Sequence, residues 1–410
     1  MIMQRAEKLK IYEKLVAFDT SHGHERPAAL YVQTLLQTHG IASQIIPMAD
    51  DHANLVAELG TGQAPVLVAS GHLDTVAIAQ DEWETDPFVL TSKHGQVYGS
   101  GVTDMKGGVA ALLIAMIELH DAQVPLAGTL RLVLTADEEG QMSGSRYLQS
   151  EQVMKQADAL LIAEPTGYRV VYANKGEVDL RITAQGRAAH SSRPNFGINA
   201  IQNLMDFLEL TKQRIESQAK AHPDAVLGQT TSTVDIFRGG IQINSIPAQA
   251  EAELNLRVVP AYANQAVLAD FKQLLSKFNS EHAGELQLEV LMNIPPVIGD
   301  ATSPLIEDIL QIATPYLKNS QYNEAELKLG QHMQEKQGFN PFDPDEIVVM
   351  GASGGTDGSE LLQEHLQGFP YAVFGPGNPI KMHQSNESAD LAMWFDYIEI
   401  YKELFQRYLG

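Results

Sequence analysis

The chain has 410 residues, with 28 basic against 51 acidic side chains and a formal net charge of −23. A surface this acidic repels a phosphate backbone, so we expect no nucleic-acid partner. Cysteine is absent, which excludes disulfides and thiolate catalysis. The hydrophobic fraction of 44% suffices for large cores, and the length favours two domains. The N-terminus is charged, and no apolar run reaches about 18 residues, so we expect a cytoplasmic protein without a membrane span.

The first part of the chain alternates between predicted helices and predicted strands. Apolar residues at helical spacing predict helices over residues 5–18, 26–39 and 109–119. Short apolar runs predict strands over residues 43–46, 54–59, 66–69, 129–134 and 160–163. The last three strands are apolar throughout or nearly so, which is typical of a parallel sheet buried on both faces.

Each of these last three strands ends in side chains that can bind a cation or move a proton. They are His72 and Asp74 after the first strand, Glu138 and Glu139 after the second, and Glu164 after the third. The carboxyl ends of parallel strands meet at one edge of a sheet, so we expect these side chains to converge. Carboxylates crowded at a buried site need a cation or shared protons.

From Gly176 the pattern changes to alternating strands and amphipathic helices. The predicted elements are a strand around 178–182, a helix over 199–215, strands over 233–237, 242–246 and 254–258, a helix over 267–274 and a strand over 286–290. Their order is that of a ferredoxin-like α+β unit. The α/β pattern then resumes in elements expected over 304–313, 347–350, 359–366, 371–374 and 389–408. Residues 319–345 are polar and are expected to be an irregular surface excursion.

We therefore expect an α/β protein with a mixed, mostly parallel sheet flanked by helices and an inserted ferredoxin-like domain. The catalytic domain is predicted to be discontinuous, covering residues 1–175 and 296–410. The inserted domain is predicted to cover residues 176–295.

The convergent residues suit a site for two metal ions. Zinc prefers imidazole nitrogen and carboxylate oxygen, and two ions about 3.5–4 Å apart can share a bridging carboxylate. His72, Asp104, Glu139, Glu164 and one later histidine could supply the ligands. Asp104 precedes the helix over 109–119, where a helix N-cap is the alternative role. His383 is the candidate histidine, with a solvated loop histidine as the alternative.

Other catalytic chemistries lack their motifs. The sequence holds no Gly-x-Ser-x-Gly nucleophile turn. The glycine-rich stretch at residues 354–358 lacks the Lys-Ser/Thr end of a phosphate-binding loop.

Taken in order, the motifs resemble those of the dinuclear-zinc amidohydrolase family. They are Ser70-Gly71-His72-Leu73-Asp74-Thr75-Val76, Gly101-Val102-Thr103-Asp104-Met105-Lys106-Gly107-Gly108, Asp137-Glu138-Glu139-Gly140, Glu164-Pro165-Thr166, Gly186-Arg187-Ala188-Ala189-His190-Ser191-Ser192 and His383. The family includes succinyl-diaminopimelate desuccinylase, acetylornithine deacetylase, aminoacylase and glutamate-releasing carboxypeptidases. The resemblance covers essentially the whole chain, and it implies a zinc-exopeptidase-like catalytic domain.

The resemblance implies a position for each metal ligand. Asp104 would bridge two divalent ions, most simply Zn²⁺, with Co²⁺ or Mn²⁺ as alternatives. His72 and Glu164 would hold one ion, and Glu139 and His383 the other. In this family the peptide bond after the bridging aspartate, here Asp104–Met105, is often cis.

The resemblance also implies roles for residues beside the metals. Asp74 would orient His72, and Glu138 would be the general base that takes a proton from the attacking water and gives it to the leaving amine. His190 would reach the active site of a partner chain, because the inserted domain of family members forms a homodimer. The alternative for His190 is a loop histidine without a catalytic role.

Substrate contacts are implied at Asn244, Arg257, Gly355, Thr356 and Lys175. An arginine suits a substrate carboxylate because its guanidinium binds two oxygens at once. The alternative for Arg257 is an ion pair at a strand edge.

The motifs indicate hydrolysis of a small N-acylated amino acid or a short peptide. Residues 351–358 resemble the desuccinylase loop, and residues 190–194 resemble acetylornithine deacetylase and aminoacylases. N-succinyl-L,L-diaminopimelate is our first choice of substrate. The alternatives are acetylornithine or another acyl amino acid, a dipeptidase or carboxypeptidase activity, and a non-catalytic metal-bound binding protein.

Overall fold

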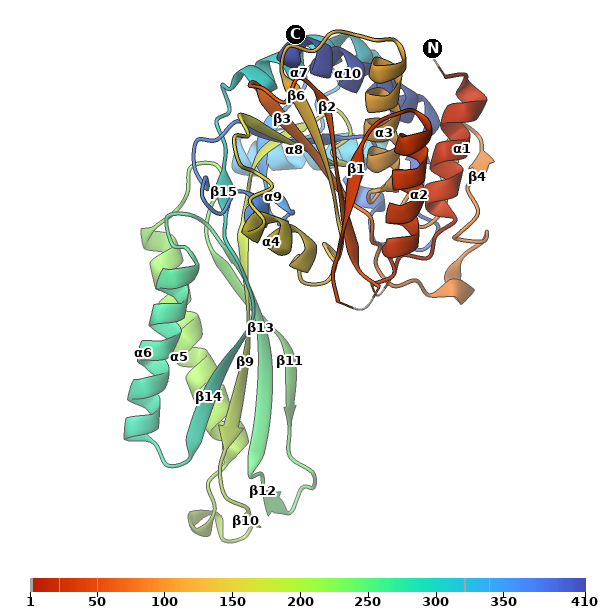
Figure 1. Ribbon diagram of the computed structural model, residues 1–410. Helices are drawn as coiled ribbons and strands as arrows, with labels where there is room; N and C mark the ends of the chain where they lie inside the picture. The colour runs from red at the N-terminus through yellow and green to blue at the C-terminus, as the bar shows by residue number, and fades with distance from the viewer. Residues whose placement is uncertain (1–2, 22, 50, 321, 339) are drawn as a thin grey trace. The chain divides into compact units, whose positions relative to one another are not determined.

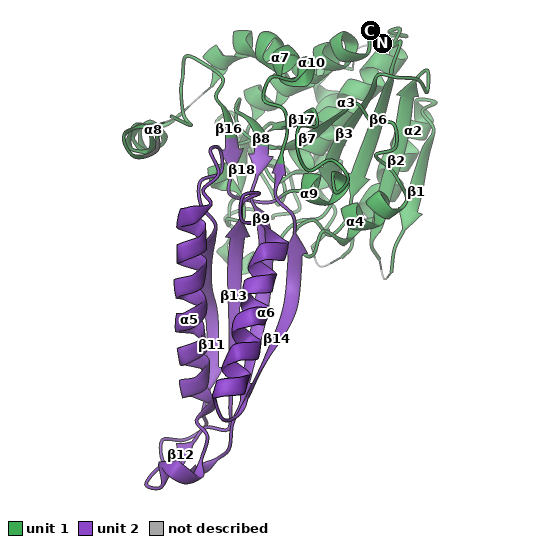
Figure 2. Cartoon of the chain, turned by 90° about the vertical axis from the view of Figure 1, so that its left-hand side faces the viewer, with its two compact units in different colours: residues 1–172, 298–350, 356–410 green, residues 173–297, 351–355 purple. Residues whose placement is uncertain are grey.

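The computed structural model describes residues 3–21, 23–49, 51–320, 322–338 and 340–410. The chain forms two compact units, shown in different colours in Figure 2. Unit 1 comprises Met1–Tyr172, Ile298–Met350 and Thr356–Gly410, and unit 2 comprises Ala173–Val297 and Gly351–Gly355. In the described residues, no helix is long and apolar enough to cross a membrane.

Most of a large mixed sheet (Figure 1) belongs to unit 1, and its strands run in the order β1-β2-β6-β3-β7-β17-β8-β15, with β16 beside β8. Their bounds are β1 Ser43–Pro47, β2 Ala53–Gly60, β3 Val66–His72, β6 Thr129–Thr135, β7 Ala159–Pro165, β8 Val170–Asn174, β15 Val297–Ile298, β16 Val349–Ala352 and β17 Tyr371–Gly375. The central strands β6, β3, β7 and β17 are parallel, and β1, β2 and β8 pair antiparallel to their neighbours. The predicted fold class is therefore confirmed.

Helices flank this sheet. They are α1 Arg5–Val16, α2 Arg26–Thr38, α3 Lys106–Asp121, α4 Ser143–Ser150, α7 Pro304–Ala313, α8 Glu324–Gln337, α9 Gly358–Leu361 and α10 Leu391–Leu409. Helix α3 is buried from Lys106 to Leu119, because it packs between strands β3 and β7 and helices α1 and α10. Its almost uninterrupted apolar sequence is what such a position requires. A small sheet of β4 Thr91–Lys93, β5 Gln96–Tyr98 and β18 Ser388–Asp390 lies beside α10.

Unit 2 contains a four-stranded antiparallel sheet in the order β11-β13-β9-β14 and two helices, α5 Ala200–Ala221 and α6 Asn264–Glu281. The strands are β9 Gly176–Gln185, β11 Thr231–Gly239, β13 Gln249–Val258 and β14 Glu285–Ile294. In β9 buried residues such as Leu180 and Ile182 alternate with more exposed ones, since one sheet face packs on the helices. This is the ferredoxin-like arrangement that the sequence predicts.

Three local predictions are wrong. Residues 242–246 are not a strand of the sheet: only β12 Ser245–Ile246 is extended, and it pairs with β10 Ala189–His190, while Ile241 and Ile243 are fully exposed. The helix expected over 359–366 shortens to α9. The excursion expected to be irregular contains α8, which the reciprocal capping contacts of Asn323 and Glu326 start.

Candidate metal centre

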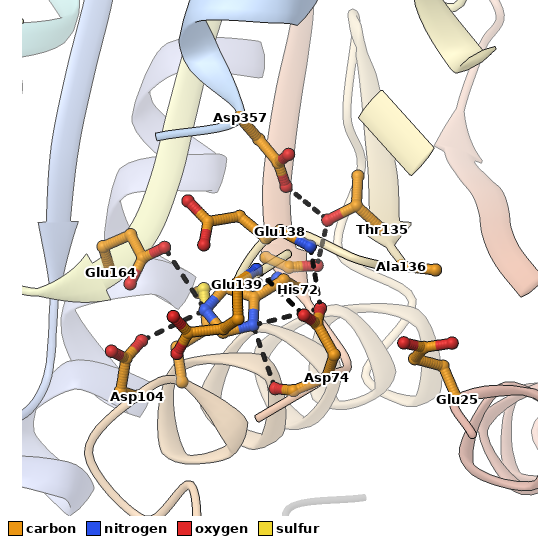
Figure 3. A network of polar contacts seen from close by, with 12 residues as sticks. Glu25, His72, Asp74, Asp104, Thr135, Ala136, Glu138, Glu139, Glu164 and Asp357 are labelled. Carbon is orange, nitrogen blue, oxygen red and sulfur yellow. Dashed lines mark hydrogen bonds and ion pairs between the residues drawn. The ribbon is translucent and has the colours of Figure 1, made fainter. Parts of the chain in front are cut away.

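Three parallel strands bring the candidate ligands to one edge of the unit 1 sheet. Strand β3 pairs with β6 so that His72 lies opposite Thr135, and it pairs with β7 so that Ser70 lies opposite Ile162. The residues that follow these positions therefore leave the sheet side by side. Figure 3 shows the resulting cluster, in which the carboxylates of Asp74, Asp104, Glu138, Glu139 and Glu164 surround the imidazole of His72.

His72, Asp104 and Glu164 form a first ligand group. The Nε2 atom of His72 lies 3.1 Å from Asp104 Oδ1 and 3.4 Å from Glu164 Oε1. Its Nδ1 atom donates to the carbonyl oxygen of Asp74 at 3.0 Å. That contact holds the proton on Nδ1, so Nε2 faces the two carboxylates.

Asp104, Glu139 and His383 form a second ligand group. The Nε2 atom of His383 lies 3.1 Å from Asp104 Oδ2 and 3.0 Å from Glu139 Oε2. Asp104 thus turns one oxygen to each group. In both groups the potential ligand atoms all lie within 4.8 Å of one another. Asp104 is not the N-cap of α3, which is Met105, and the Asp104–Met105 peptide bond is cis, as the resemblance implies.

The electrostatics of the cluster favour a bound cation. Burial raises the pKa of Glu138, Glu139 and Glu164 above the usual range, and neighbouring carboxylates raise it further. Burial alone would lower the pKa of His72, but Glu164, Asp104 and Asp74 raise it well above the usual value. Contacts with Asp104 and Glu139 raise the pKa of His383 to about 10. Without a cation, these three glutamates and two histidines therefore hold protons more tightly than such side chains ordinarily do.

The donor set also fits the chemistry of the implied metals. Each group offers one imidazole nitrogen and carboxylate oxygens, the ligands of catalytic zinc sites. The residues present therefore fit two divalent ions that share Asp104.

Asp74 fixes the turn that carries the acidic residues after β6. Its Oδ1 accepts from the backbone N–H of Glu138 at 3.1 Å, and its Oδ2 accepts from that of Glu139 at 2.9 Å. Asp74 is 4% exposed. Burial would raise its pKa, but contacts with His72 and these two N–H groups hold it below the usual value. The carboxylate therefore ties the end of β3 to the turn after β6.

A family model described as peptidase family M20/M25/M40 matches residues 68–407. The chain belongs to this family. The solved structure of the Bacillus subtilis YXEP protein, a relative in fold, is that of a dinuclear metal-binding peptidase of the M20 family. The paired ligand groups of this chain fit such a site, and the protein is a metal-dependent amidohydrolase.

The named activities of similar proteins agree with this assignment. The chain is 35% identical over 433 residues to a probable succinyl-diaminopimelate desuccinylase from Staphylococcus epidermidis, covering 100% of this chain and 99% of that protein. It is 32% identical over 261 residues to acetylornithine deacetylase from Proteus mirabilis, covering 62% of this chain and 66% of that protein. The M20 metallo-carboxypeptidase Sso-CP2 from Sulfolobus solfataricus has the same fold, with a TM-score of 0.76, 18% identity and 99% of each chain covered.

Sequence reasoning assigned no role to Glu387, whose carboxylate accepts a hydrogen bond from the backbone N–H of Asp104. Its Oε1 accepts from the backbone N–H groups of Thr103 and Asp104 at 2.6 and 2.8 Å, and its Oε2 accepts from Gly101 at 2.8 Å. The only signal in the sequence is its place four residues after His383. Because its partners are backbone groups, no spacing of side chains points to it.

Asp357 is a second residue that sequence reasoning missed. It is 2% exposed, and its Oδ2 accepts from Thr135 Oγ1 at 2.5 Å. Burial raises its pKa to about 6. Figure 3 places its carboxylate on the same side of the cluster as that of Glu138. Its neighbour Thr356 contacts the Tyr371 hydroxyl at 2.9 Å.

The other predicted site residues lie in unit 2, in two separate places. His190 lies in β10 and is exposed, and its Nδ1 accepts from the backbone N–H of Ser192. Asn244 lies beside it, because the Asn244 carbonyl accepts from the backbone N–H of Ser191 at 3.0 Å. Lys175 and Arg257 lie at the other end of β9. Lys175 donates to the Gln229 carbonyl at 2.6 Å, and Arg257 pairs with Glu177 at 2.6 Å. Gly355 is half-buried in the loop that precedes Thr356.

Proposed function

We propose that this M20 protein hydrolyses the amide bond of an N-acyl amino acid, with N-succinyl-L,L-diaminopimelate as its substrate and succinate and diaminopimelate as products. The observation that carries the reaction class is the pair of ligand groups that share Asp104, with Glu138 beside them. The full-length similarity to a probable succinyl-diaminopimelate desuccinylase supports the choice of substrate.

In this proposal His72 and Glu164 hold one Zn²⁺ ion, Glu139 and His383 hold the other, and Asp104 binds both. When bound, two such ions polarise an amide carbonyl and lower the pKa of water to about 7. The turn contacts of Asp74 and the backbone contacts of Glu387 keep these ligands in place before the metals arrive.

Glu138 is the general base of the proposed reaction. Its carboxylate accepts the proton of the attacking water and then gives it to the leaving amine nitrogen. Burial raises its pKa well above the usual value, and Glu164 and Asp357 raise it further. A carboxylate with a raised pKa is a stronger base toward the attacking water than an ordinary carboxylate, and its acid form can give the proton to the leaving amine.

Substrate recognition is assigned to His190, Asn244, Arg257, Lys175, Gly355 and Thr356. We place His190 in the active site of a partner subunit, where it would stabilise the developing oxyanion. A dimer through unit 2 is supported by β11, an edge strand with exposed Val234 and Phe237. A substrate carboxylate that binds Arg257 has to compete with Glu177, its present partner.

Acetylornithine is the second candidate substrate, since the deacetylase from Proteus mirabilis matches over 62% of this chain. A peptidase activity of the same chemistry is supported by the name of the carboxypeptidase with the same fold. A non-catalytic metal-bound protein is disfavoured, because such a protein has no use for Glu138.

The test is hydrolysis by zinc-reconstituted protein of N-succinyl-L,L-diaminopimelate, N-acetylornithine and a panel of dipeptides, side by side. We expect the highest kcat/KM for the succinyl substrate and loss of activity with a chelator. A preference for another amide would overturn the substrate alone. If none of these amides is hydrolysed, the proposed function is wrong.

A further inference from the structure

A polar cavity in unit 1 lies outside the ligand groups of the metal centre. It has a volume of about 270 Å³. Its walls come from the start of α8, from Gly167 and Arg169 after β7, from Asn378 and Lys381 after β17, and from the β5–β18 ladder. The α8 segment is the excursion to which the sequence analysis gave no function. In Figure 1 it is the light blue helix that follows α7 in the chain.

Four charged side chains line this cavity: Arg169, Lys381, Glu326 and Asp390. Their formal charges sum to zero. None of them has an oppositely charged group within 4.0 Å among the residues that the structure describes. Arg169 is 7% exposed and Glu326 is 3% exposed. A buried cation and a buried anion that share a cavity without pairing are costly, unless a ligand supplies the missing partners.

The surroundings hold Arg169 in place without neutralising it. Its Nε donates to the Thr166 carbonyl at 2.7 Å, and its guanidinium lies 4.6 Å above the ring of Phe342. Among the described residues no hydrogen bond is made by the Nη atoms of the guanidinium, so they can donate to a ligand in the cavity. A guanidinium held by Nε and by a ring face presents the geometry that binds a carboxylate through two parallel hydrogen bonds.

Glu326 is held equally firmly. Its Oε2 accepts from the N–H of Asn323 at 2.7 Å, within the capping box of α8, and its Oε1 accepts from the side-chain amide of Asn378. Each carboxylate oxygen of Glu326 thus accepts one hydrogen bond from a neutral donor, and each can accept one more. An ammonium group is the partner that would compensate its charge.

We propose that this cavity binds a free α-amino acid, whose carboxylate pairs with Arg169 and whose ammonium group pairs with Glu326. A small zwitterion is the ligand class that supplies both charges at short separation and fits about 270 Å³. The ligand has to carry both charges, because a ligand that paired with one side chain alone would leave the other as a buried unpaired charge. The site is independent of the proposed hydrolysis, because none of its charged groups belongs to the two ligand groups.

The test is calorimetric titration of the full-length protein with L-alanine, L-glutamate, L-lysine and L-methionine, in zinc-loaded and in chelator-treated form. We expect at least one amino acid to bind with one site per chain and a Kd below about 10 mM, in both forms. In the chelator-treated form, in which the proposed hydrolytic site lacks its metals, the amino acid's N-acetyl derivative and its methyl ester should each bind at least about tenfold more weakly, because each removes one charge. This comparison needs no variant.

Variants then locate the site. Arg169→Gln and Glu326→Gln should each weaken binding by at least about tenfold, while glutamine at position 326 can still accept the capping bond of Asn323. Lys328→Gln is the matched control, because Lys328 lies on α8, is exposed and forms an ion pair with Glu324. It should bind as the parent does. The melting temperature of each variant checks folding.

Three results would overturn the proposal. One is the absence of saturable binding by all four amino acids. Another is binding that disappears when the metals are removed, which would place the ligand at the metal centre. The third is binding that folded Arg169→Gln and Glu326→Gln proteins retain at full strength.

Discussion

Glu138 and Glu139 are neighbours in the chain, yet the structure gives them different surroundings. Glu139 contacts His383 in the second ligand group, whereas Glu138 belongs to neither ligand group. Asp74 accepts from the backbone N–H groups of both residues. The proposed function assigns the Glu139 carboxylate to the metals and the Glu138 carboxylate to proton transfer. A substitution at each position separates these two roles.

Replacing Glu138 by glutamine should lower kcat by about 10²–10⁴-fold, because the amide cannot accept the proton of the attacking water. The metal content measured by atomic absorption should stay at the parent value. Glu139→Gln is the comparison: it should lose metal from the second ligand group as well as activity. Parent-like hydrolysis by a Glu138→Gln protein with full metal content would refute the assigned role.

Glu387 allows a test of how the bridging ligand is positioned. Glu387→Ala leaves three backbone N–H groups without an acceptor in a buried loop, so Asp104 loses its support. We expect metal affinity to fall by about 10–100-fold, measured by competition with a chromogenic chelator. Glu387→Gln should fall less, because its carbonyl oxygen can still accept from Thr103 and Asp104.

Glu118 supplies the control for that experiment. It is another buried glutamate, held by Lys8 at 3.0 Å and Lys402 at 2.8 Å. It lies twelve residues along α3 from Lys106, about 18 Å away at the helical rise. Glu118→Gln should lower the melting temperature without changing metal affinity. If both glutamates affect metal affinity equally, Glu387 acts only through general stability.

At the scale of elements, α3 has to approach β7 closely. A Cβ atom on Gly108 would lie 2.2 Å from the carbonyl oxygen of Ala163, a backbone atom that cannot turn away. Ala163 precedes Glu164, so the packing of this helix also sets the position of a proposed ligand. Gly108 is therefore required by the close packing of α3 on β7, which composition alone does not reveal.

Gly108→Ala should destabilise the protein by about 1–3 kcal/mol, because α3 has to move off the sheet. The free energy of unfolding is measured by urea titration followed by circular dichroism. Gly354→Ala is the control, since a Cβ there meets nothing within 4 Å and its backbone is not left-handed. Equal stability of the two variants would show that α3 adjusts without cost.

The strands that carry the ligands could be predicted because their sequences are apolar over their whole length. Strands β3, β6 and β7 are almost entirely buried, and runs of this kind have few alternatives in an α/β protein. The strand predicted over residues 242–246 is wrong, because Ile241 and Ile243 alternate with polar residues but are fully exposed. Alternation predicts a strand only where one face is buried.

Helix α8 could not be predicted for the opposite reason. Its sequence is largely polar, so it lacks an apolar stripe of helical period. What starts it is the capping box of Asn323 and Glu326, together with packing of nearby Tyr322 against Phe342. In the site, too, some residues could be predicted and others could not. The ligands at strand ends could be predicted from the sequence. Glu387 could not, since its contact with Asp104 joins residues 283 positions apart.

At the scale of the whole molecule, the two units divide the proposed functions between them. Both ligand groups and Glu138 lie in unit 1, whereas His190 and Asn244 lie in unit 2. If His190 acts in a partner's active site, each complete site needs unit 1 of one chain and unit 2 of another. This arrangement predicts complementation between two inactive variants.

Glu138→Gln and His190→Ala homodimers should each be nearly inactive. Mixed dimers, formed by co-expressing the two chains with different affinity tags, should regain activity, because one site then combines Glu138 from one chain with His190 from the other. Random pairing of equal amounts yields about half mixed dimers with one complete site each, hence about a quarter of the parent activity. If His190 acted within its own chain, no mixed dimer would contain a complete site, and the mixture would remain as inactive as its components.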